Sequence, residues 1–303
     1  MTADTAGYGA LVRRAGQRAE ASWHGSASPA GGTPGWRGQF YPPGLPQRRE
    51  LEHVAERLGT VEVNGSFYSL QRPSSWQSWR DQVPPDFVFA VKGPRYITHM
   101  KKLVDVEAPL GTFLASGVLS LGERLGPLLW QLPPNLRFDP DRLSAFLDLL
   151  PRSTRQASSY AAAHHDASKL KEPADTTAPV ELPLRHVVEA RHDSFRTSEF
   201  CELLRAHDVG MVVADSAGTW PMFDEVTSEV AYVRLHGDEE LYTSGYSAQA
   251  LDHWAGKVRD WESDGLDVFV YFDNDAKVHA PFDAMALQER LGIAPEGASE
   301  ISS

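Results

Sequence analysis

The chain has 303 residues, of which 42% are hydrophobic and 10% aromatic, and its 41 acidic side chains outnumber its 29 basic ones to give a net charge of −12. The 24 glycines and 21 prolines fall below the ~25–30% share of low-complexity chains, which excludes a disordered or fibrous protein. The single cysteine, Cys201, excludes an internal disulfide and a cysteine-rich metal site. The acidic balance argues against indiscriminate binding to nucleic acid.

Short runs of β-branched and aromatic residues alternate along the chain with segments of helical period, which is typical of parallel β/α units. Seven such runs lie at residues 61–68, 87–92, 128–132, 186–190, 209–215, 230–236 and 268–273, and an eighth is expected near residues 21–26. Apolar residues recur at helical spacing over residues 51–58, 143–150, 251–261 and 284–291. Asp139 is a capping candidate before the second of these stripes, and the last lies between Pro281 and Gly292, as helix start and stop signals require.

Eight strand and helix units in a chain of this length predict an α/β fold of the (β/α)8, TIM-like barrel type. The alternative is a doubly wound sheet, which would normally carry a glycine-rich phosphate turn after its first strand. Residues 25–35, GSASPAGGTPG, match neither GxGxxG nor GxxxxGK[ST]. The barrel is therefore the favoured architecture.

Residues 153–183 interrupt the alternation between the fourth and fifth predicted strands. They are first helix-like and then rich in Pro, Asp and Thr, which indicates an insertion with a mobile second half. We expect a flexible N-terminus over residues 1–20, one barrel domain over residues 21–293 and a frayed tail over residues 294–303. No apolar run approaches the ~20 residues that cross a bilayer, and residues 1–30 lack the apolar core of a secretory signal, so we expect a cytoplasmic protein without a membrane partner. Its oligomeric state is not indicated.

Polar residues gather on one face of the predicted strands and at their ends. Side chains of one parity in a barrel strand point into the interior. If the valines face outward, the inward residues are Glu62, Asn64, Ser66 and Tyr68, then Glu189 and Arg191, then Tyr232, Arg234 and His236. Further polar side chains end the other strands, namely Lys92, Gln131, Asp215, Asp273 and Asn274. The carboxyl ends of barrel strands converge on one mouth, where active sites lie, so we expect a site there.

Buried charges at a barrel mouth have two interpretations. They form an active site, or they form a structural network in which Glu62 and Glu189 neutralise Arg234 and Arg191. For any one residue the two interpretations are about equally good. For the whole set an active site is favoured, because a structural network does not account for Asn64, Lys92, Gln131, His236 and Asp273.

Residues 91–104, VKGPRYITHMKKLV, carry five basic side chains and no acid up to Val104. In an acidic protein this local reversal of charge predicts a binding site for phosphate or carboxylate groups. We assign that role to Lys92, Arg95 and His99, and expect Lys101 and Lys102 to be solvated. His99, Glu189, Asp215 and His236 are suitable types of ligand for a divalent metal, but their spacing is not diagnostic, so a metal is not favoured and no cofactor is indicated.

Seven sequence blocks occur in order: WRGQFYP at residues 36–42, VEVNGSFY at 61–68, FAVKGPRYITH at 89–99, LGPLLWQLPP at 125–134, VEARHDSF at 188–195, VRLHG at 233–237 and YFDNDAKVHAPFDA at 271–284. With these blocks the chain resembles the YecE-like family, catalogued as domain of unknown function seventy-two. The resemblance implies a TIM-like barrel and no established reaction. It marks as motif positions Glu62, Asn64, Lys92, His99, Gln131, Glu189, Arg191, His192, Arg234, His236 and Asn274.

The chain departs from that family pattern in two places. The family usually runs from its first strand into a Gly-Thr-Ser-Gly-Trp-like turn, whereas here a Pro/Gly-rich spacer separates residues 25–28 from Gly35 and Trp36. Asp273 stands where the family more often has asparagine, which adds negative charge at the mouth.

Two functions of different class follow from these residues. The first is a hydrolase or lyase for a phosphorylated sugar or nucleotide-like substrate, in which Lys92 and Arg95 hold the anion, Glu189 or Asp215 is the general base and His236 the general acid. Its other candidate binding residues are Asn64, His99, Gln131, Arg191, Arg234, Asp273 and Asn274. The second is a non-catalytic barrel that binds an anionic ligand, possible ligands including single-stranded nucleic acid, with Trp36, Tyr68 and Tyr246 as stacking surfaces. The mixture of acids, bases and cations favours the enzyme.

Overall fold

The computed structural model describes residues 8–12, 20–23, 34–274 and 277–293. Within these residues nine strands form a closed barrel in chain order. They are β1 (Tyr8–Val12), β2 (Glu20–Trp23), β3 (Thr60–Val63), β4 (Val88–Lys92), β5 (Leu125–Gln131), β6 (His186–Glu189), β7 (Gly210–Asp215), β8 (Val230–Leu235) and β9 (Asp267–Phe272). Each neighbouring pair from β2 to β9 is parallel, which gives the eight parallel strands of a (β/α)8 barrel.

The ring closes through β1, which lies within residues 1–20, the segment expected to be flexible. β1 pairs antiparallel with both β2 and β9, with Ala10 opposite Val270 on one side and Ala21 on the other. β2 corresponds to the strand expected near residues 21–26, of which residues 24–26 lie outside the described part of the chain, as do residues 294–303 of the expected tail. The antiparallel strand therefore fills the position between the first and last parallel strands.

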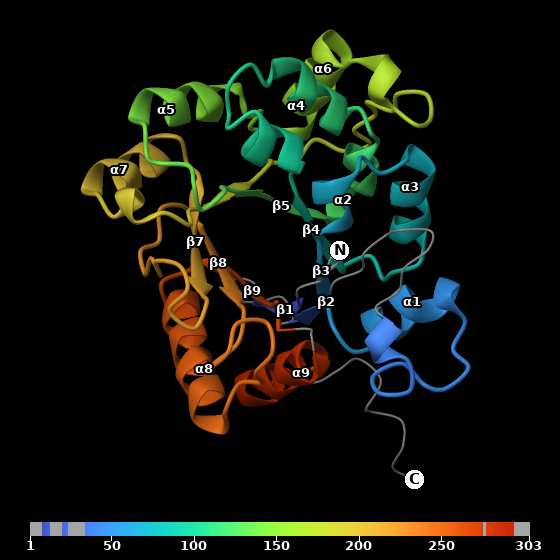
Figure 1. Ribbon diagram of the computed structural model, residues 1–303. Helices are drawn as coiled ribbons and strands as arrows, with labels where there is room; N and C mark the ends of the chain where they lie inside the picture. The colour runs from blue at the N-terminus through green and yellow to red at the C-terminus, as the bar shows by residue number, and fades with distance from the viewer. Residues whose placement is uncertain (1–7, 13–19, 24–33, 275–276, 294–303) are drawn as a thin grey trace.

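Helices surround the strands on the outside (Figure 1). They are α1 (Glu50–Ala55), α2 (Gly65–Tyr68), α3 (Pro73–Asp81), α4 (Glu107–Leu114), α5 (Pro140–Leu149), α6 (Thr154–His164), α7 (Ser198–Ala206), α8 (Ala248–Ser263) and α9 (Ala280–Leu291). Short 3-10 turns lie at η1 (Pro34–Trp36), η2 (Gln47–Arg49), η4 (Val118–Arg124), η5 (Ala167–Lys169) and η6 (Asp193–Phe195), and η3 (Tyr96–Met100) is a π-helical turn. Among the described residues, no helix combines the length and the apolar character needed to span a membrane.

Sequence signals for helix ends are confirmed at two helices. The Asp139 carboxylate accepts a hydrogen bond from the backbone N–H of Arg142 at 3.1 Å and so caps α5. α9 has Pro281 in its first turn and ends at Gly292, whose φ of 73° suits glycine. Each cap satisfies backbone groups that the helix itself leaves unpaired.

Two apolar clusters confirm the parity of the strands. One fills the barrel interior and includes Val212, Ala214, Tyr232 and Tyr271. The other lies between the barrel and the helices and includes the alternate positions of the same strands, such as Val213. The interior cluster closes the barrel below Arg234, because the Tyr232 and Tyr271 rings pack with their centroids 4.8 Å apart. The charged side chains at the carboxyl ends of the strands therefore lie directly above the apolar interior cluster.

The predicted strand over residues 61–68 is shorter than expected, and the inward positions assigned beyond Val63 are corrected accordingly. The chain turns into α2 after Asn64, where the Ser66 hydroxyl donates to the carbonyl oxygens of Val63 at 2.9 Å and Lys92 at 2.6 Å. Alternation therefore no longer applies, and Tyr68 is 45% exposed instead of lying inside the barrel. Asn64 itself is buried directly after β3.

The segment over residues 153–183 begins with α6, capped by Ser153, whose hydroxyl accepts from the Gln156 N–H at 3.2 Å. Its second half has little regular structure and is hydrogen-bonded to neighbouring segments. The Asp175 N–H donates to the carbonyl oxygen of Ala115 at 3.0 Å, and the Thr154 hydroxyl donates to that of Val180 at 2.6 Å. The segment lies between β5 and β6, outside the barrel (Figure 1).

Candidate functional site

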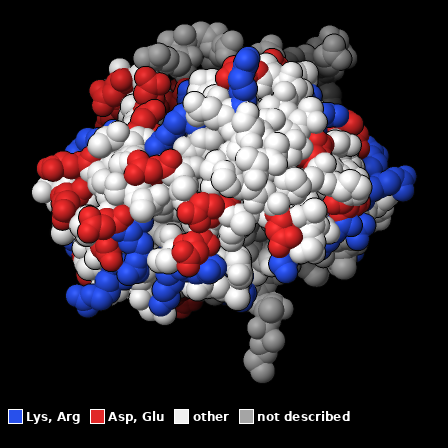
Figure 2. Space-filling model, turned by 90° about the horizontal axis from the view of Figure 1, so that it is seen from above, with Lys and Arg blue, Asp and Glu red and all other residues white. Residues whose placement is uncertain are grey.

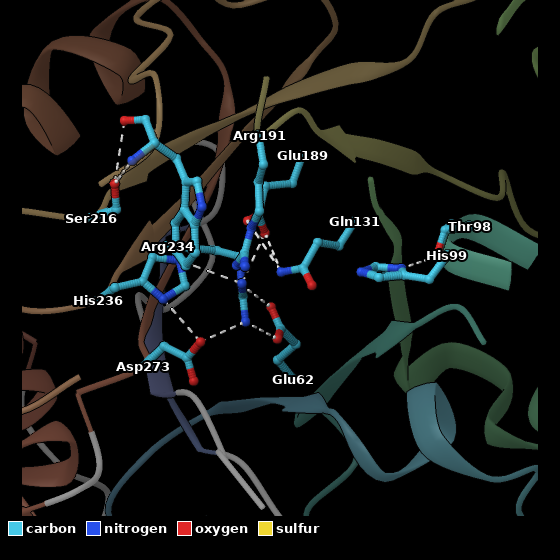
Figure 3. Close-up of polar contacts among 11 residues, drawn as sticks. Glu62, Thr98, His99, Gln131, Glu189, Arg191, Ser216, Arg234, His236 and Asp273 are labelled. Atoms are coloured by element: carbon cyan, nitrogen blue, oxygen red, sulfur yellow. Dashed lines mark hydrogen bonds and ion pairs between the residues drawn. The ribbon is translucent and has the colours of Figure 1, made fainter. Parts of the chain in front are cut away.

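Arg234 lies at the centre of the barrel mouth and binds three carboxylates. Its Nε and Nη2 donate to the two oxygens of Glu62 at 3.0 and 2.8 Å, Nη1 donates to Glu189 at 2.8 Å, and Nη2 also donates to Asp273 at 3.0 Å. Figure 3 shows the carboxylates converging on the guanidinium group from separate strands. We call these four residues the Arg234 network. All lie on, or directly after, strands β3, β6, β8 and β9.

Every member of this network is almost fully enclosed, and none exceeds 5% side-chain exposure. Burial alone would lower the pKa of Arg234, but the three carboxylates raise it well above its usual value. Burial would raise the pKa of Glu189, yet Arg191 and Arg234 hold it well below the usual range, and Arg234 and His236 lower that of Asp273 in the same way. Arg234, Glu189 and Asp273 therefore stay ionised at neutral pH.

Glu189 has no capacity left for accepting a substrate proton. Besides binding Arg234, its two oxygens accept hydrogen bonds from Gln131 Nε2, each at 3.1 Å, and it forms an ion pair with Arg191. Arg191 in turn stacks on Trp220, with its Cζ atom 3.6 Å from the ring centroid. Glu189 thereby fixes the position of Arg191, whose side chain is 10% exposed at the edge of the network.

His236 is also fully buried at the mouth. Its Nδ1 lies 3.0 Å from Asp273, its Nε2 lies 3.5 Å from Arg234 Nη1, and the rings of Trp220 and Tyr242 pack edge-on against it at 5.8 and 5.4 Å. Burial, followed by Arg234, lowers its pKa in spite of Asp273. His236 is therefore neutral at pH 7, as its contact with the donor-only guanidinium group also requires.

Lys92 ends β4 and is only 7% exposed, so its side chain lies inside the barrel mouth and not on the surface. Its Nζ lies 4.4 Å from the centroid of the Phe67 ring, and among the described residues it has no hydrogen bond or ion pair with an acidic group. Burial, followed by Arg234, lowers the pKa of Lys92 to about 8. The next residue, Gly93, fixes the chain, because a Cβ atom there would lie 2.3 Å from the Trp130 ring.

His99 lies on the π-helical turn η3 and also contacts Phe67. The Phe67 and His99 rings meet edge-on at 5.0 Å, and His99 Nδ1 lies 2.9 Å from the Thr98 hydroxyl. Figure 3 shows the imidazole pointing toward Gln131 and the Arg234 network. Burial and the Lys92 charge lower the pKa of His99 to about 4. Three residues beyond η3 adopt left-handed backbone angles, Lys102, Leu103 and Asp105, and such strain and π-turns concentrate at functional sites.

Several predicted site residues lie away from this cluster. Asp215 has the outward parity of Val213, so it contacts Tyr246, whose hydroxyl lies 3.1 Å away, and not the Arg234 network. Burial raises the pKa of Asp215. Asn274 donates to Asp283 at 2.7 Å in a neighbouring cluster, and Arg95 is exposed.

The structure also separates the four residues considered as metal ligands. Within the described part of the chain, no three His, Cys, Asp or Glu side chains are grouped to hold a metal ion. Asp215 points out of the barrel, so it does not join His99, Glu189 and His236. Phe67, Trp220 and Tyr242 were not predicted as site residues from the sequence. Each lies in a segment that follows a strand, and such segments build the active sites of barrels, so this rule could have pointed to them.

The fold and the site together define a (β/α)8-barrel protein with a buried charged network at the carboxyl ends of its strands. Comparison with known proteins identifies its family. The chain belongs to the family described as "Protein of unknown function DUF72", whose model matches residues 32–302. Over 104 residues it is 36% identical to UPF0759 protein YecE of Escherichia coli strain K12, and equally to that of strain O157:H7. The match covers 33% of this chain and 37% of each relative, so it spans little more than a third of their length.

Solved structures of the same family share the fold. A DUF72 family protein from Thermotoga maritima MSB8 superposes with a TM-score of 0.64 at 24% identity, covering 85% of this chain and 95% of that one. Another, from Enterococcus faecalis V583, gives a TM-score of 0.63 at 17% identity, covering 80% and 88%. At these identities the comparison supports the barrel and carries no further assignment.

Proposed function

We propose that the barrel mouth is the active site of a hydrolase or lyase that acts by acid–base chemistry on a small anionic substrate, such as a phosphorylated sugar or a nucleotide-like molecule. One observation carries the proposal. The Lys92 ammonium group is nearly buried, yet the carboxylates around it bind Arg234 and Arg191 instead. A buried cation without a counter-ion is costly, and an anionic ligand would supply the missing partner.

The surrounding residues support distinct roles. Lys92 and Arg191 hold the anion, and Arg95, exposed at the rim, attracts it. Lys92 also titrates close to neutral pH, where acid–base groups are most effective, because its pKa is lowered to about 8. His99 is unprotonated at pH 7 and points toward the same space, so it is the proton acceptor that we assign (Figure 3).

This assignment revises the roles expected from the sequence. Glu189 is engaged by two arginines and Gln131, so we assign it the positioning of Arg191 instead of general-base catalysis. His236 has no exposed surface, and we assign it the positioning of Asp273. Asp215 contacts Tyr246 and has no role in the proposed reaction.

A non-catalytic anion-binding barrel is the second candidate, favoured by the engagement of all three network carboxylates with Arg234. Its nucleic-acid version loses two of its three stacking surfaces, because Trp36 is fully buried and Tyr246 is 7% exposed, which leaves Tyr68. Figure 2 shows acidic and basic side chains interspersed on the face in view, with no continuous basic stripe there. A small anion therefore fits the structure better than a polyanion.

The test is a panel of sugar phosphates and nucleotides incubated with the full chain, with products detected by mass spectrometry. We expect turnover of at least one compound by the wild type and by Lys101→Met, which makes the same substitution in the same basic segment but at a partly exposed lysine. Turnover should be lost in Lys92→Met. Saturable binding without turnover on any compound would favour the non-catalytic barrel, and the absence of both would refute the proposal.

A further inference from the structure

We infer that Lys92 is a nucleophile that forms an imine with the carbonyl carbon of an anionic aldehyde or ketone, which makes the protein an imine-forming lyase. The inference rests on the proposed function and narrows it to carbonyl substrates. It is carried by the position of the Lys92 amine, which is enclosed by charged groups but bonded to none of them.

Imine formation requires an amine whose lone pair is not engaged and which substrate can reach. Lys92 Nζ makes no hydrogen bond or ion pair with the described residues, and it lies over the Phe67 ring, 4.4 Å from the centroid. The residue is largely buried but keeps 7% of its surface in contact with solvent at the end of β4. It lies at the carboxyl end of β4, where barrel active sites form.

Three contacts hold the backbone at Lys92 and Gly93 in place, and so fix the point from which the Lys92 side chain extends. The Ser66 hydroxyl donates to the Lys92 carbonyl oxygen at 2.6 Å, and the Gly93 N–H donates to that of Leu129 at 2.8 Å. Gly93 also packs so closely on Trp130 that no larger residue fits. Positioning of this kind is what a nucleophile needs and what a solvated surface lysine lacks.

Burial and the charge of Arg234 favour the neutral amine of Lys92. Burial removes water from the ammonium group, and the Arg234 guanidinium group opposes a further positive charge more strongly than either Glu62 or Glu189 favours it, while Arg191 opposes it least. With a pKa of about 8, roughly a quarter of the Lys92 side chains are neutral at pH 7.5, against about 0.1% of ordinary lysines. This difference makes Lys92 selectively reactive.

The reaction balances without an oxidant or reductant. The neutral Lys92 nitrogen attacks the carbonyl carbon, a C–N bond forms as the C=O π bond breaks, and one proton passes from the nitrogen to the oxygen by way of His99 to give a carbinolamine. The nitrogen then loses its proton to His99, the hydroxyl group takes that proton and leaves as water, and a C=N bond remains. The imine takes a proton from solvent and then accepts the electron pair of the bond that breaks at the adjacent carbon, so that the other fragment leaves without that pair and an enamine remains. The enamine takes a proton at carbon, and water hydrolyses the C=N bond to release the carbonyl product and the free lysine.

The experiment traps the imine on the full chain. Glyoxylate, an anionic aldehyde, is incubated with the protein and sodium cyanoborohydride at pH 7.5, and carboxymethylated lysines are located by peptide mass spectrometry. We expect labelling of Lys92 at least tenfold above that of Lys101 and Lys102, slowed by added phosphate and accelerating as the pH rises through about 8. Acetaldehyde, which lacks the anionic group, should show much weaker selectivity for Lys92.

Lys92→Arg is the matched variant, because it keeps the positive charge and cannot form this imine. Its melting curve checks that it folds. Labelling of Lys92 no greater than that of Lys101 would overturn the inference. If Lys92→Met weakens phosphate binding while Lys92 stays unlabelled in the wild type, the imine is refuted and the anion site stands; if Lys92 is labelled selectively but phosphate does not bind, the imine stands and the anion site is refuted.

Discussion

Arg234 and Glu62 form a two-bond ion pair, 3.0 Å from Nε and 2.8 Å from Nη2, in which neither side chain has any exposed surface. Such a pair compensates for its lost hydration only when its remaining bonds are also made. In this pair the remaining bonds are made, because the Tyr232 hydroxyl donates to Glu62 at 2.7 Å and Arg234 also binds Glu189 and Asp273. Arg234 is therefore the residue that holds the ends of several strands together.

Arg234→Ala should lower the free energy of unfolding by about 3–5 kcal/mol, because it removes the cation shared by three buried carboxylates, of which Glu189 keeps its ion pair with Arg191. Urea denaturation at pH 7 measures the loss. The control is Arg205→Ala, which removes the exposed ion pair with Glu225 and should cost less than about 1 kcal/mol. Equal stability of the two variants would contradict the structural role of Arg234.

Lys92→Met should leave the fold intact and raise its stability at pH 7. Because the pKa of Lys92 is about 8 in the folded protein and near 10.5 when unfolded, protonation favours the unfolded chain. Removing the charge should therefore add roughly 1–3 kcal/mol at pH 7, and this advantage should shrink between pH 8 and 10.5. Urea midpoints at pH 7, 8.5 and 10 test the sign. A Lys92→Met variant that unfolds would show that Lys92 belongs to the structural network.

Glu189→Gln should destabilise the fold and increase its response to anions. The substitution keeps the size of the side chain but removes the negative charge between Arg191 and Arg234. We expect a loss of about 3–5 kcal/mol, since one partner of a buried pair is removed. Inorganic phosphate should raise the melting temperature of this variant more than that of the wild type. An unchanged melting temperature with no added phosphate effect would contradict the assigned positioning role.

Stability should fall as the pH drops from about 6.5 to 4, in part through His186. This histidine is neutral in the folded protein, because its Nδ1 accepts from the Trp130 indole at 3.1 Å and its Nε2 donates to the Pro151 carbonyl at 2.8 Å. Burial lowers the pKa of His186 to about 4, so the unfolded chain binds the proton first and the stabilising contribution is lost over that range.

Urea unfolding at pH 7, 5.5 and 4.5 measures this dependence. His186→Asn should be less stable at pH 7 but should show a slope smaller by about 1.4 kcal/mol per pH unit, the value for one proton. Parallel slopes for the variant and the wild type would contradict a neutral folded-state His186.

Strand parity explains how much of the site the sequence predicts. Glu62, Glu189 and Arg234 were placed on inward positions of separate strands, and the structure brings them into contact. The same rule failed at Tyr68, because the strand ends at Val63 and hydrogen bonds of Ser66 start a helical turn. Periodicity within one strand cannot show where the next turn begins.

The isolation of Lys92 was beyond sequence reasoning for a different reason. Which cation a carboxylate binds depends on distances between strands that are far apart in the chain. In the folded protein, Glu62, Glu189 and Asp273 form their ion pairs with Arg234 and not with Lys92. Trp220 and Tyr242 come from loops after β7 and β8, whose paths follow no periodic pattern. The sequence signals identified the mouth, but the pairing within it required the fold.

Isothermal titration of inorganic phosphate into the wild type, Lys92→Met and Lys101→Met at pH 7 tests most directly whether Lys92 is the unpaired cation of an anion site. We expect saturable binding by the wild type and by Lys101→Met, with affinity at least tenfold weaker in a folded Lys92→Met, a difference of about 1.4 kcal/mol or more. Equal affinity in all three proteins, or no binding by the wild type, would contradict it.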